Sequence, residues 1–134
     1  MTQEEKELLL KDLSARLPYG VKIELTWWVM DEGTCLSTTL EPDHIEQILN
    51  DEVGDAEIKP YLFPMSSMTE EQKREYNNLQ CYVPIYYYEY RELVEEIELH
   101  PTLESFEYLI KNHFDFRSLI KKGLAIDATG LNIY

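Results

Sequence analysis

Three residues near the carboxyl end of the sequence carry side chains that often perform acid–base chemistry. His113, Asp115 and Arg117 occupy alternate positions, so in an extended segment they would share one face. An imidazole beside a carboxylate can transfer a proton, and a guanidinium can bind an anion. This spacing makes the three residues candidates for the catalytic group of a small hydrolase-type enzyme.

A structural role explains the same three residues without a reaction, and it is favoured. Asp115 has the side chain of a helix N-cap, which predicts a short helix over residues 116–122 that Gly123 ends. The neighbouring side chains of Phe114 and Phe116 are then expected in the core, while His113 and Arg117 close the preceding helix. We therefore expect no catalytic site here, and the enzyme remains the alternative.

Metal binding is not predicted either. His44 lies beside Asp43 and Glu46, but this spacing does not place three ligands on one helical face, and no second His or Cys accompanies them. A zinc site usually needs four converging ligands, or three and a water. Residues 51–57 lack the alternating oxygen ligands of a calcium loop.

Other reaction motifs are missing from the sequence. It has no G-x-S-x-G nucleophile motif, and its five glycines form no phosphate-binding loop. Adjacent carboxylates such as Glu95 and Glu96 are expected by chance in a chain with 26 acidic residues. The sequence predicts no cofactor and favours a non-enzymatic protein.

A run of tyrosines is the strongest candidate for a binding surface. The run consists of Tyr82, Tyr86, Tyr87, Tyr88 and Tyr90. It can be read as ordinary packing on a sheet face or as an exposed surface, because tyrosine combines a large rigid ring with a hydroxyl group. As partner-binding residues we name Tyr86, Tyr88, Tyr90 and the neighbouring Glu92.

The charge of the chain indicates which partners can approach. Ten carboxylates lie between Lys22 and Lys59 with no Lys or Arg among them, and the 134 residues carry a formal charge of −14. Within this acidic block, Asp51 and Glu52 are further candidate partner-binding residues. Such charge opposes contact with nucleic acid and with anionic membranes, and it favours a protein with a basic surface. Residues 108–134 are the exception, with four basic and two acidic residues.

The sequence favours a cytoplasmic protein. The apolar run Leu8–Leu10 is too short for the core of a signal peptide, and no run of about 18 apolar residues could form a spanning helix. Cys35 and Cys81 are far apart and form no CxxC motif, so we expect reduced thiols in the core.

The order of predicted elements indicates an α+β fold. A capping box at Thr2 and Glu5 opens a helix over 3–17, and a second at Thr69 and Gln72 opens one over 70–80. Alternating apolar residues predict a hairpin over Val21–Leu40. Residues 42–51 fit a short helix or a short strand, and the helix is favoured. Further expected elements are an extended segment over 56–62, a strand over 81–90 with Pro84 at a sheet edge or bulge, a helix over 102–112 and a short strand over 124–127.

The element type of one segment stays open, and the last helix carries an apolar stripe. Residues 91–99 fit either a helix or a strand. The stripe of Leu103, Phe106, Leu109 and Ile110 is expected to lie in the core. We predict a single domain over 1–134, in which helices near 3–17, 70–80 and 102–112 cover a small antiparallel sheet, with a subdomain division near 64–69 as the alternative.

Three segments resemble a family of small uncharacterised proteins encoded in prophage-like and other mobile regions of gut anaerobic bacteria. They read LSARLPYGV over 13–21, IKPYLFPMSSMT over 58–69 and HFDFRSLIKKGLA over 113–125. The family supplies no catalytic residues to carry over. The resemblance implies a cytoplasmic accessory role connected with phage or mobile DNA, and residues 26–57 and 80–98 are where such proteins differ.

The function that the sequence favours is protein–protein interaction through an acidic, tyrosine-bearing surface. Three alternatives stay open beside the small enzyme. They are a DNA-mimic inhibitor, a structural component of a phage particle, and a homodimer joined along a tyrosine-rich edge strand.

Overall fold

The chain consists of two compact units. The computed structural model describes residues 1–29, 32–50 and 57–134. Unit 1 comprises Met1–Ser67 and Ile110–Tyr134, and unit 2 comprises Met68–Leu109. The first boundary falls inside the segment 64–69 where the sequence offered a subdomain division. Whether the two units unfold as one domain stays a prediction.

The helices of unit 1 begin and end where local signals place them. Helix α1 spans Gln3–Arg16 and continues as the 3-10 turn η1 over Leu17–Tyr19. The hydroxyl of Thr2 accepts the N–H of Glu5 at 3.1 Å, as the capping box predicts. Gly20 follows with a φ of 67°, a left-handed conformation that turns the chain into the first strand. The short helix expected from 42 is α2, over Pro42–Leu49.

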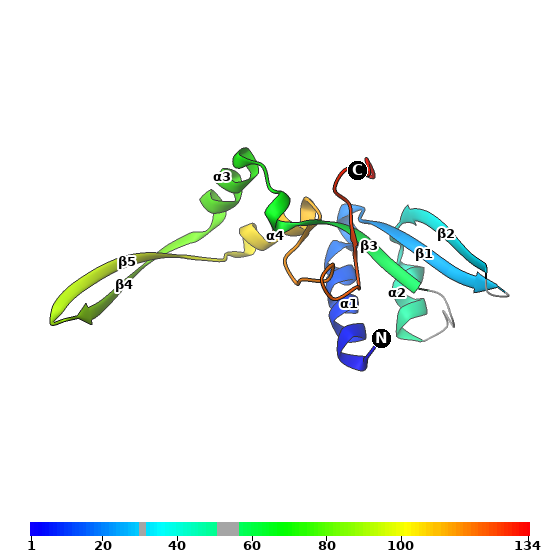
Figure 1. Ribbon diagram of the computed structural model, residues 1–134, viewed down its shortest axis with the longest axis horizontal. Coiled ribbons are helices and arrows are strands. Elements are labelled where there is room, and N and C mark those ends of the chain that lie inside the picture. Colours follow the sequence, from blue (N-terminus) through cyan, green and yellow to red (C-terminus); the bar gives the residue numbers. More distant parts are fainter. Residues whose placement is uncertain (30–31, 51–56) are drawn as a thin grey trace. The chain divides into compact units, whose positions relative to one another are not determined.

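The sheet of unit 1 is built around an antiparallel centre (Figure 1). Its strands are β1 (Lys22–Val29), β2 (Glu32–Thr39), β3 (Glu57–Pro64), β6 (Phe114–Asp115) and β7 (Ile126–Asp127). Strand β1 pairs antiparallel with both β2 and β3, which confirms the hairpin and the small antiparallel sheet of an α+β fold. The two-residue strands β6 and β7 each pair parallel with β3. Strand β7 lies within the short strand expected over 124–127, whereas β6 and the parallel pairing were not expected.

The core of unit 1 lies between this sheet and its two helices. Leu9 and Leu13 of α1 and Ile48 of α2 are buried together with Val21 and Leu62. Burying side chains of this size stabilises the fold by about 1.5–3 kcal/mol each before conformational entropy is subtracted. Of the three helices that the sequence expected over the sheet, α1 packs on it.

Unit 2 consists of a hairpin and its flanking helices. The elements are α3 (Glu70–Leu79), β4 (Cys81–Glu89), β5 (Glu92–His100) and α4 (Leu103–Lys111), the last continuing into unit 1. The capping box at Thr69 and Gln72 is present, with both reciprocal hydrogen bonds. Residues 91–99, which fitted either element type, form a strand.

Three expectations from the sequence are wrong. On α4, Leu109 is buried, but Leu103 is 80% and Phe106 40% exposed, so the predicted stripe is not all core. Residues 116–122 form turns and bends instead of a helix. Both cysteines are exposed rather than in the core. Cys35 lies on β2 and Cys81 lies on β4, and both strands expose these side chains to solvent.

No helix in the described part of the chain is both long and apolar enough to cross a membrane.

Candidate partner-binding hairpin

The register of β4 and β5 divides the hairpin into two chemically different faces. Residues directly opposite each other in an antiparallel pair point to the same side of the ribbon. The tyrosine face, as we name it, consists of Tyr82, Pro84, Tyr86, Tyr88, Leu93, Glu95, Ile97 and Leu99. The glutamate face consists of Cys81, Val83, Ile85, Tyr87, Glu89, Glu92, Val94, Glu96, Glu98 and His100.

The more apolar of the two faces is the more exposed one. On the tyrosine face, Tyr88 is 76%, Ile97 67% and Leu93 61% exposed. On the glutamate face, by contrast, the aliphatic side chains of Val83 and Val94 are half-buried. The tyrosines of this ribbon are therefore not packed into a sheet core, which was one of the two roles open to them.

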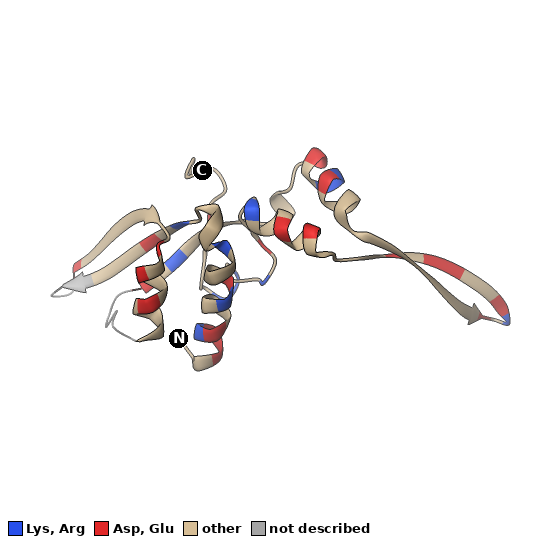
Figure 2. Ribbon diagram, turned by 180° about the vertical axis from the view of Figure 1, so that it is seen from behind, with Lys and Arg blue, Asp and Glu red and all other residues tan. Residues whose placement is uncertain are grey.

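Each strand contributes a different chemistry to the hairpin. Figure 2 shows the acidic positions gathered on β5, whereas β4 has no charged residue before Glu89. Two tyrosine hydroxyls donate across the ribbon to this acidic strand. Tyr86 donates to Oε1 of Glu95 at 3.4 Å on the tyrosine face, and Tyr87 donates to Oε1 of Glu96 at 2.7 Å on the glutamate face. Donating this bond to Glu96 also raises the pKa of Tyr87, so that the hydroxyl keeps its proton.

A tight turn closes the hairpin between Tyr90 and Arg91. Their φ angles are 50° and 67°, the double positive value that a two-residue type I′ turn requires. Neither residue is the Asn or Gly usually found there, so the turn is held at some cost in free energy. The turn projects the Tyr90 side chain into solvent, 93% exposed.

The structure brings together some of the partner-binding residues named from the sequence. Tyr86 and Tyr88 lie on the tyrosine face, and Tyr90 lies in the adjoining turn. Glu92 lies on the other face, opposite Glu89. Asp51 and Glu52 lie outside the described residues.

Sequence reasoning missed the contribution of β5 to this surface. Leu93, Ile97 and Leu99 extend the tyrosine face across the second strand, and Glu95 lies among them. The signal was present in their spacing of two and four residues, which is the period of one strand face. It did not decide the element type, because Leu93, Val94 and Ile97 also fit a helix.

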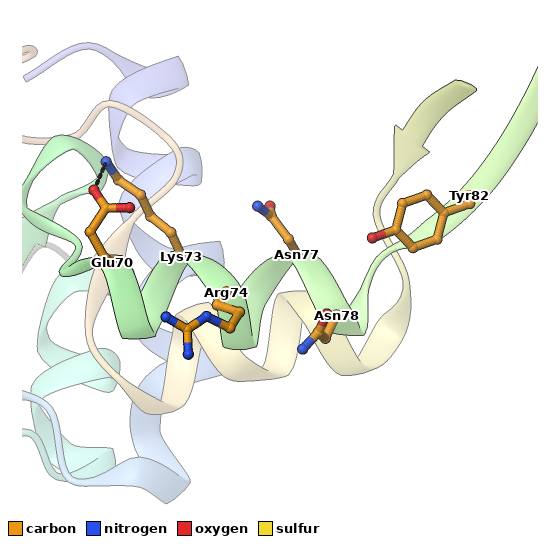
Figure 3. Close-up of a pocket in the computed structure, with 6 residues that line it drawn as sticks. All are labelled: Glu70, Lys73, Arg74, Asn77, Asn78 and Tyr82. Carbon is orange, nitrogen blue, oxygen red and sulfur yellow. Dashed lines mark hydrogen bonds and ion pairs between the residues drawn. The ribbon is translucent and has the colours of Figure 1, made fainter. Parts of the chain in front are cut away.

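Unit 2 also has an open hollow on α3 (Figure 3). It has a volume of about 400 Å³ and is lined by Glu70, Lys73, Arg74, Asn77, Asn78 and Tyr82. Lys73 is already paired with Glu70 at 3.5 Å, and the lining side chains are exposed, so water competes for every polar contact. This arrangement can attract an anion weakly, but it does not exclude water as a reaction site would.

The three candidate catalytic residues each have a different partner. The His113 ring stacks on Tyr134, with centroids 3.9 Å apart. Both Asp115 oxygens accept backbone N–H groups, of Leu119 and Ile120, at 2.9 Å. Asp115 is therefore a cap, as expected, but it caps a turn because its bonds reach four and five residues ahead instead of two or three. Arg117 donates to Asp12, so no contact in the described structure joins the three into one reactive group.

Arg117 belongs instead to a buried ionic cluster that joins α1 to the carboxyl-terminal segment. Nε of Arg16 lies 2.8 Å from one oxygen of Asp12, and Nε of Arg117 lies 3.2 Å from the other. Arg16 also donates from Nη2 to the carbonyl of Phe114 at 2.6 Å. The guanidinium groups of both arginines lie over the Phe116 ring. Asp12 is 1% exposed and Arg16 is fully buried.

The cluster could have been found from the helix pattern. Asp12 and Arg16 are four residues apart and share the helix face of Leu9 and Leu13, which is the face that packs on the sheet. Two charges on a buried stripe indicate an ion pair, because either one alone would be too costly to bury.

The surroundings of His113 keep its ring neutral. Burial, and secondarily the charge of Arg16, lower the pKa of His113 to about 4. Nδ1 of His113 and Nη1 of Arg16 are both buried, and neither has a hydrogen-bond partner among the described residues. The neighbouring Tyr134 hydroxyl donates to the carbonyl of Tyr61 at 2.7 Å and accepts from the N–H of Lys22 at 2.8 Å. Burial raises the pKa of Tyr134 to about 12, which preserves its role as a donor.

The remaining metal candidate is also accounted for by local structure. Nδ1 of His44 accepts the N–H of Glu41 at 2.9 Å, which caps α2. Among the described residues, no three His, Cys, Asp or Glu side chains gather in a group that could hold a metal ion.

Comparison with known proteins adds no assignment to these sites, because no protein-family model, curated protein or solved structure matches the chain.

Proposed function

We propose that this protein acts without catalysis, as an accessory factor that binds another protein through the β4–β5 hairpin. The observation that carries this proposal is the continuous apolar surface of the tyrosine face, formed by aromatic and aliphatic side chains that are 41–76% exposed. Exposed apolar surface that is contiguous costs solubility, and it typically marks a site of association. Tyrosine is also among the residues most enriched at the energetic centres of protein interfaces.

The hairpin's architecture supports the same proposal. An isolated two-stranded ribbon is marginally stable in water. A partner that covers one face would supply the second layer that such a ribbon lacks. The proposed partner has a basic surface, because the whole chain carries a formal charge of −14 and electrostatic attraction speeds the encounter. A cytoplasmic setting connected with phage or mobile DNA is proposed on the segments that resemble the prophage-encoded family.

The test is affinity capture from the cells that encode the chain, followed by binding measurements with the purified captured protein. Tyr86→Ser combined with Tyr88→Ser should abolish capture. The matched control, Glu4→Gln combined with Glu7→Gln at two exposed positions of α1, should retain it. Raising the salt from 50 to 300 mM should slow association. If no captured protein depends on the β4–β5 hairpin for its binding, the proposed function is wrong.

A further inference from the structure

The tyrosine face is large enough to serve as one side of a stable interface. Its six exposed aromatic and aliphatic side chains present on the order of 700 Å² of surface, which approaches the roughly 800 Å² that each partner contributes to an interface of standard size. The six are Tyr82, Tyr86, Tyr88, Leu93, Ile97 and Leu99.

The edge of β4 is poorly suited to adding another strand. Because the turn has two residues, Glu89 and Glu92 form the hydrogen-bonded pair beside it. Every second residue of β4 before Glu89, beginning with Tyr88, therefore directs its backbone N–H and C=O groups away from β5. Pro84 is one of these outward positions, directly opposite Ile97. Since proline has no N–H, the middle of this edge lacks a donor, which is a common protection against edge pairing.

The edge of β5 is protected by charge. Glu92, Glu95, Glu96 and Glu98 follow one another along nine residues with no basic residue among them. A neutral or acidic strand laid along this edge would meet their like charge or would have to desolvate them. The two edges are therefore closed to most strands by different means, whereas the tyrosine face is left open.

A second copy of the chain is a poor occupant of this face. Unit 2 contains ten acidic and three basic residues, a formal charge of −7. Stacking two tyrosine faces about a twofold axis would place both Glu95 carboxylates in one apolar interface without a cation. Burying unpaired carboxylates in this way costs several kcal/mol.

Glu95 specifies what kind of surface would fit. It is the one carboxylate on the tyrosine face of the described hairpin, and Tyr86 donates a hydrogen bond to it from the opposite strand. Its neighbour Glu96 makes the equivalent bond with Tyr87 on the glutamate face. A lysine or arginine arriving over Glu95 would pair with the carboxylate and also contact tyrosine rings.

We infer that the tyrosine face docks flat against an apolar surface of a cationic partner protein, with Glu95 pairing to a Lys or Arg of that partner. This assignment rests on the proposed function and narrows it to one face, one mode of docking and one matching charge. The remaining carboxylates of the hairpin steer the encounter without entering the contact.

Synthetic helical peptides provide probes of this chemistry. The first peptide has a leucine face bordered by lysines, the second replaces lysine with glutamate, and the third replaces leucine with serine. Binding of each to the full chain is followed by fluorescence anisotropy. The leucine–lysine peptide should bind at least about tenfold more tightly than the other two, because it alone supplies both the apolar area and the cation.

Glu95 and Glu96 form a matched pair of variants, since they are adjacent, exposed and on opposite faces. Glu95→Gln should weaken binding of the leucine–lysine peptide about fivefold, and Glu96→Gln less than twofold. Glu95→Lys should transfer the preference to the leucine–glutamate peptide. Tyr88→Ser combined with Ile97→Ser should lower affinity at least about tenfold, with an unchanged circular dichroism spectrum as the folding control.

Four results would overturn the inference. If Glu95→Gln and Glu96→Gln weaken binding of the leucine–lysine peptide equally, the overall negative charge of the hairpin attracts the peptide, and Glu95 has no specific role. A gain of binding in Pro84→Val would point to edge pairing. Self-association in sedimentation velocity that Ile97→Ser abolishes would identify a second copy as the occupant, and Ile97-dependent binding to phosphatidylcholine vesicles would identify a lipid surface.

The proposed function can survive the failure of this inference. If the captured native partner binds normally to the Tyr88→Ser, Ile97→Ser variant but loses affinity when Glu96 and Glu98 of the glutamate face are replaced by glutamine, then binding through the hairpin holds and the tyrosine-face assignment is wrong.

Discussion

At the scale of single residues, the most constrained group is the Asp12 carboxylate. It receives one guanidinium on each oxygen in a setting where almost no solvent reaches it. Its two partners come from opposite ends of the chain, since Arg16 ends α1 and Arg117 follows β6. Among the described residues, Asp12 and Asp115 are the buried carboxylates.

Removing the carboxylate of Asp12 should destabilise the protein strongly. In Asp12→Ala the buried Arg16 keeps its charge without an anion, which we expect to cost about 3–5 kcal/mol of unfolding free energy. The double variant Asp12→Leu with Arg16→Met should recover part of this loss, because both charges are gone. Urea unfolding, followed by the fluorescence of Trp27 and Trp28, measures the free energy of unfolding of each variant. The control is Glu70→Ala, whose exposed pair with Lys73 should matter by about 0.5 kcal/mol or less.

Acid should destabilise the protein through His113. Its pKa of about 4 when folded lies below the 6.5 of an ordinary histidine, so between these values the unfolded chain binds more protons. The stability contributed by neutral His113 is therefore complete above about pH 7 and falls as the pH drops from 6.5 towards 4. The charged and titratable groups that act here are Arg16 of α1 and Tyr134 of the carboxyl-terminal segment.

Urea midpoints at several pH values between 7.5 and 5 would measure this dependence. His113→Phe retains an aromatic ring against Tyr134 and removes the titrating group, so its midpoints should vary less with pH. His100→Gln, which changes an exposed histidine, should behave like the parent. An equal slope for His113→Phe and the parent would contradict the assignment.

At the scale of elements, most of the fold could be predicted because local signals agree with it. The capping residues Thr2 and Thr69 start α1 and α3, and the alternation from Val21 onward predicts the β1–β2 hairpin. The failures came where a local pattern has two solutions. Asp115 has the side chain of a helix cap, yet its oxygens reach the N–H groups of a turn.

The candidate site was predictable only in part, for a related reason. The tyrosines of β4 stood out by composition, whereas Leu93, Ile97 and Leu99 join them only through strand pairing, which spacing alone could not distinguish from a helix. The exposure of Leu103 could not be predicted from periodicity either, because an apolar stripe shows which residues share a helix face but does not show what covers it.

Replacing the hairpin turn should stabilise the ribbon. Tyr90→Asn with Arg91→Gly places the residues preferred in a type I′ turn where φ is already positive, which should be worth about 1 kcal/mol. Amide exchange in β4 and β5 should then slow by about fivefold, as measured by NMR. Exchange in β1 and β3 serves as the internal control. Faster exchange in the variant would mean that the Tyr90 or Arg91 side chain itself supports the hairpin.

At the scale of the whole molecule, the two units differ in how much they bury. Most of the buried hydrophobic residues belong to unit 1, whereas Met68 and Leu109 are the ones that fall within the described unit 2. The acidic excess is present in both, but unit 2 combines it with exposed aromatic surface. Buried apolar surface and exposed aromatic surface are thus concentrated in different parts of the sequence.

This difference predicts an order of opening under native conditions. Amides of β1 and β3 should be protected from hydrogen exchange by a larger free energy than those of β4 and β5, because local stability follows buried apolar contacts. Hydrogen exchange read by mass spectrometry would resolve the two sets of peptides. Equal protection in both would instead support the single cooperative domain that the sequence predicts.

The two exposed thiols have a practical consequence for work with this protein. Cys35 lies on β2 and Cys81 on β4, so each unit presents one reactive sulfur at its surface. A pair of maleimide dyes at these natural positions would report the separation of the units by energy transfer without any engineered cysteine. The same two sulfurs will crosslink chains under air, so a reducing agent belongs in every buffer used for the sedimentation measurements.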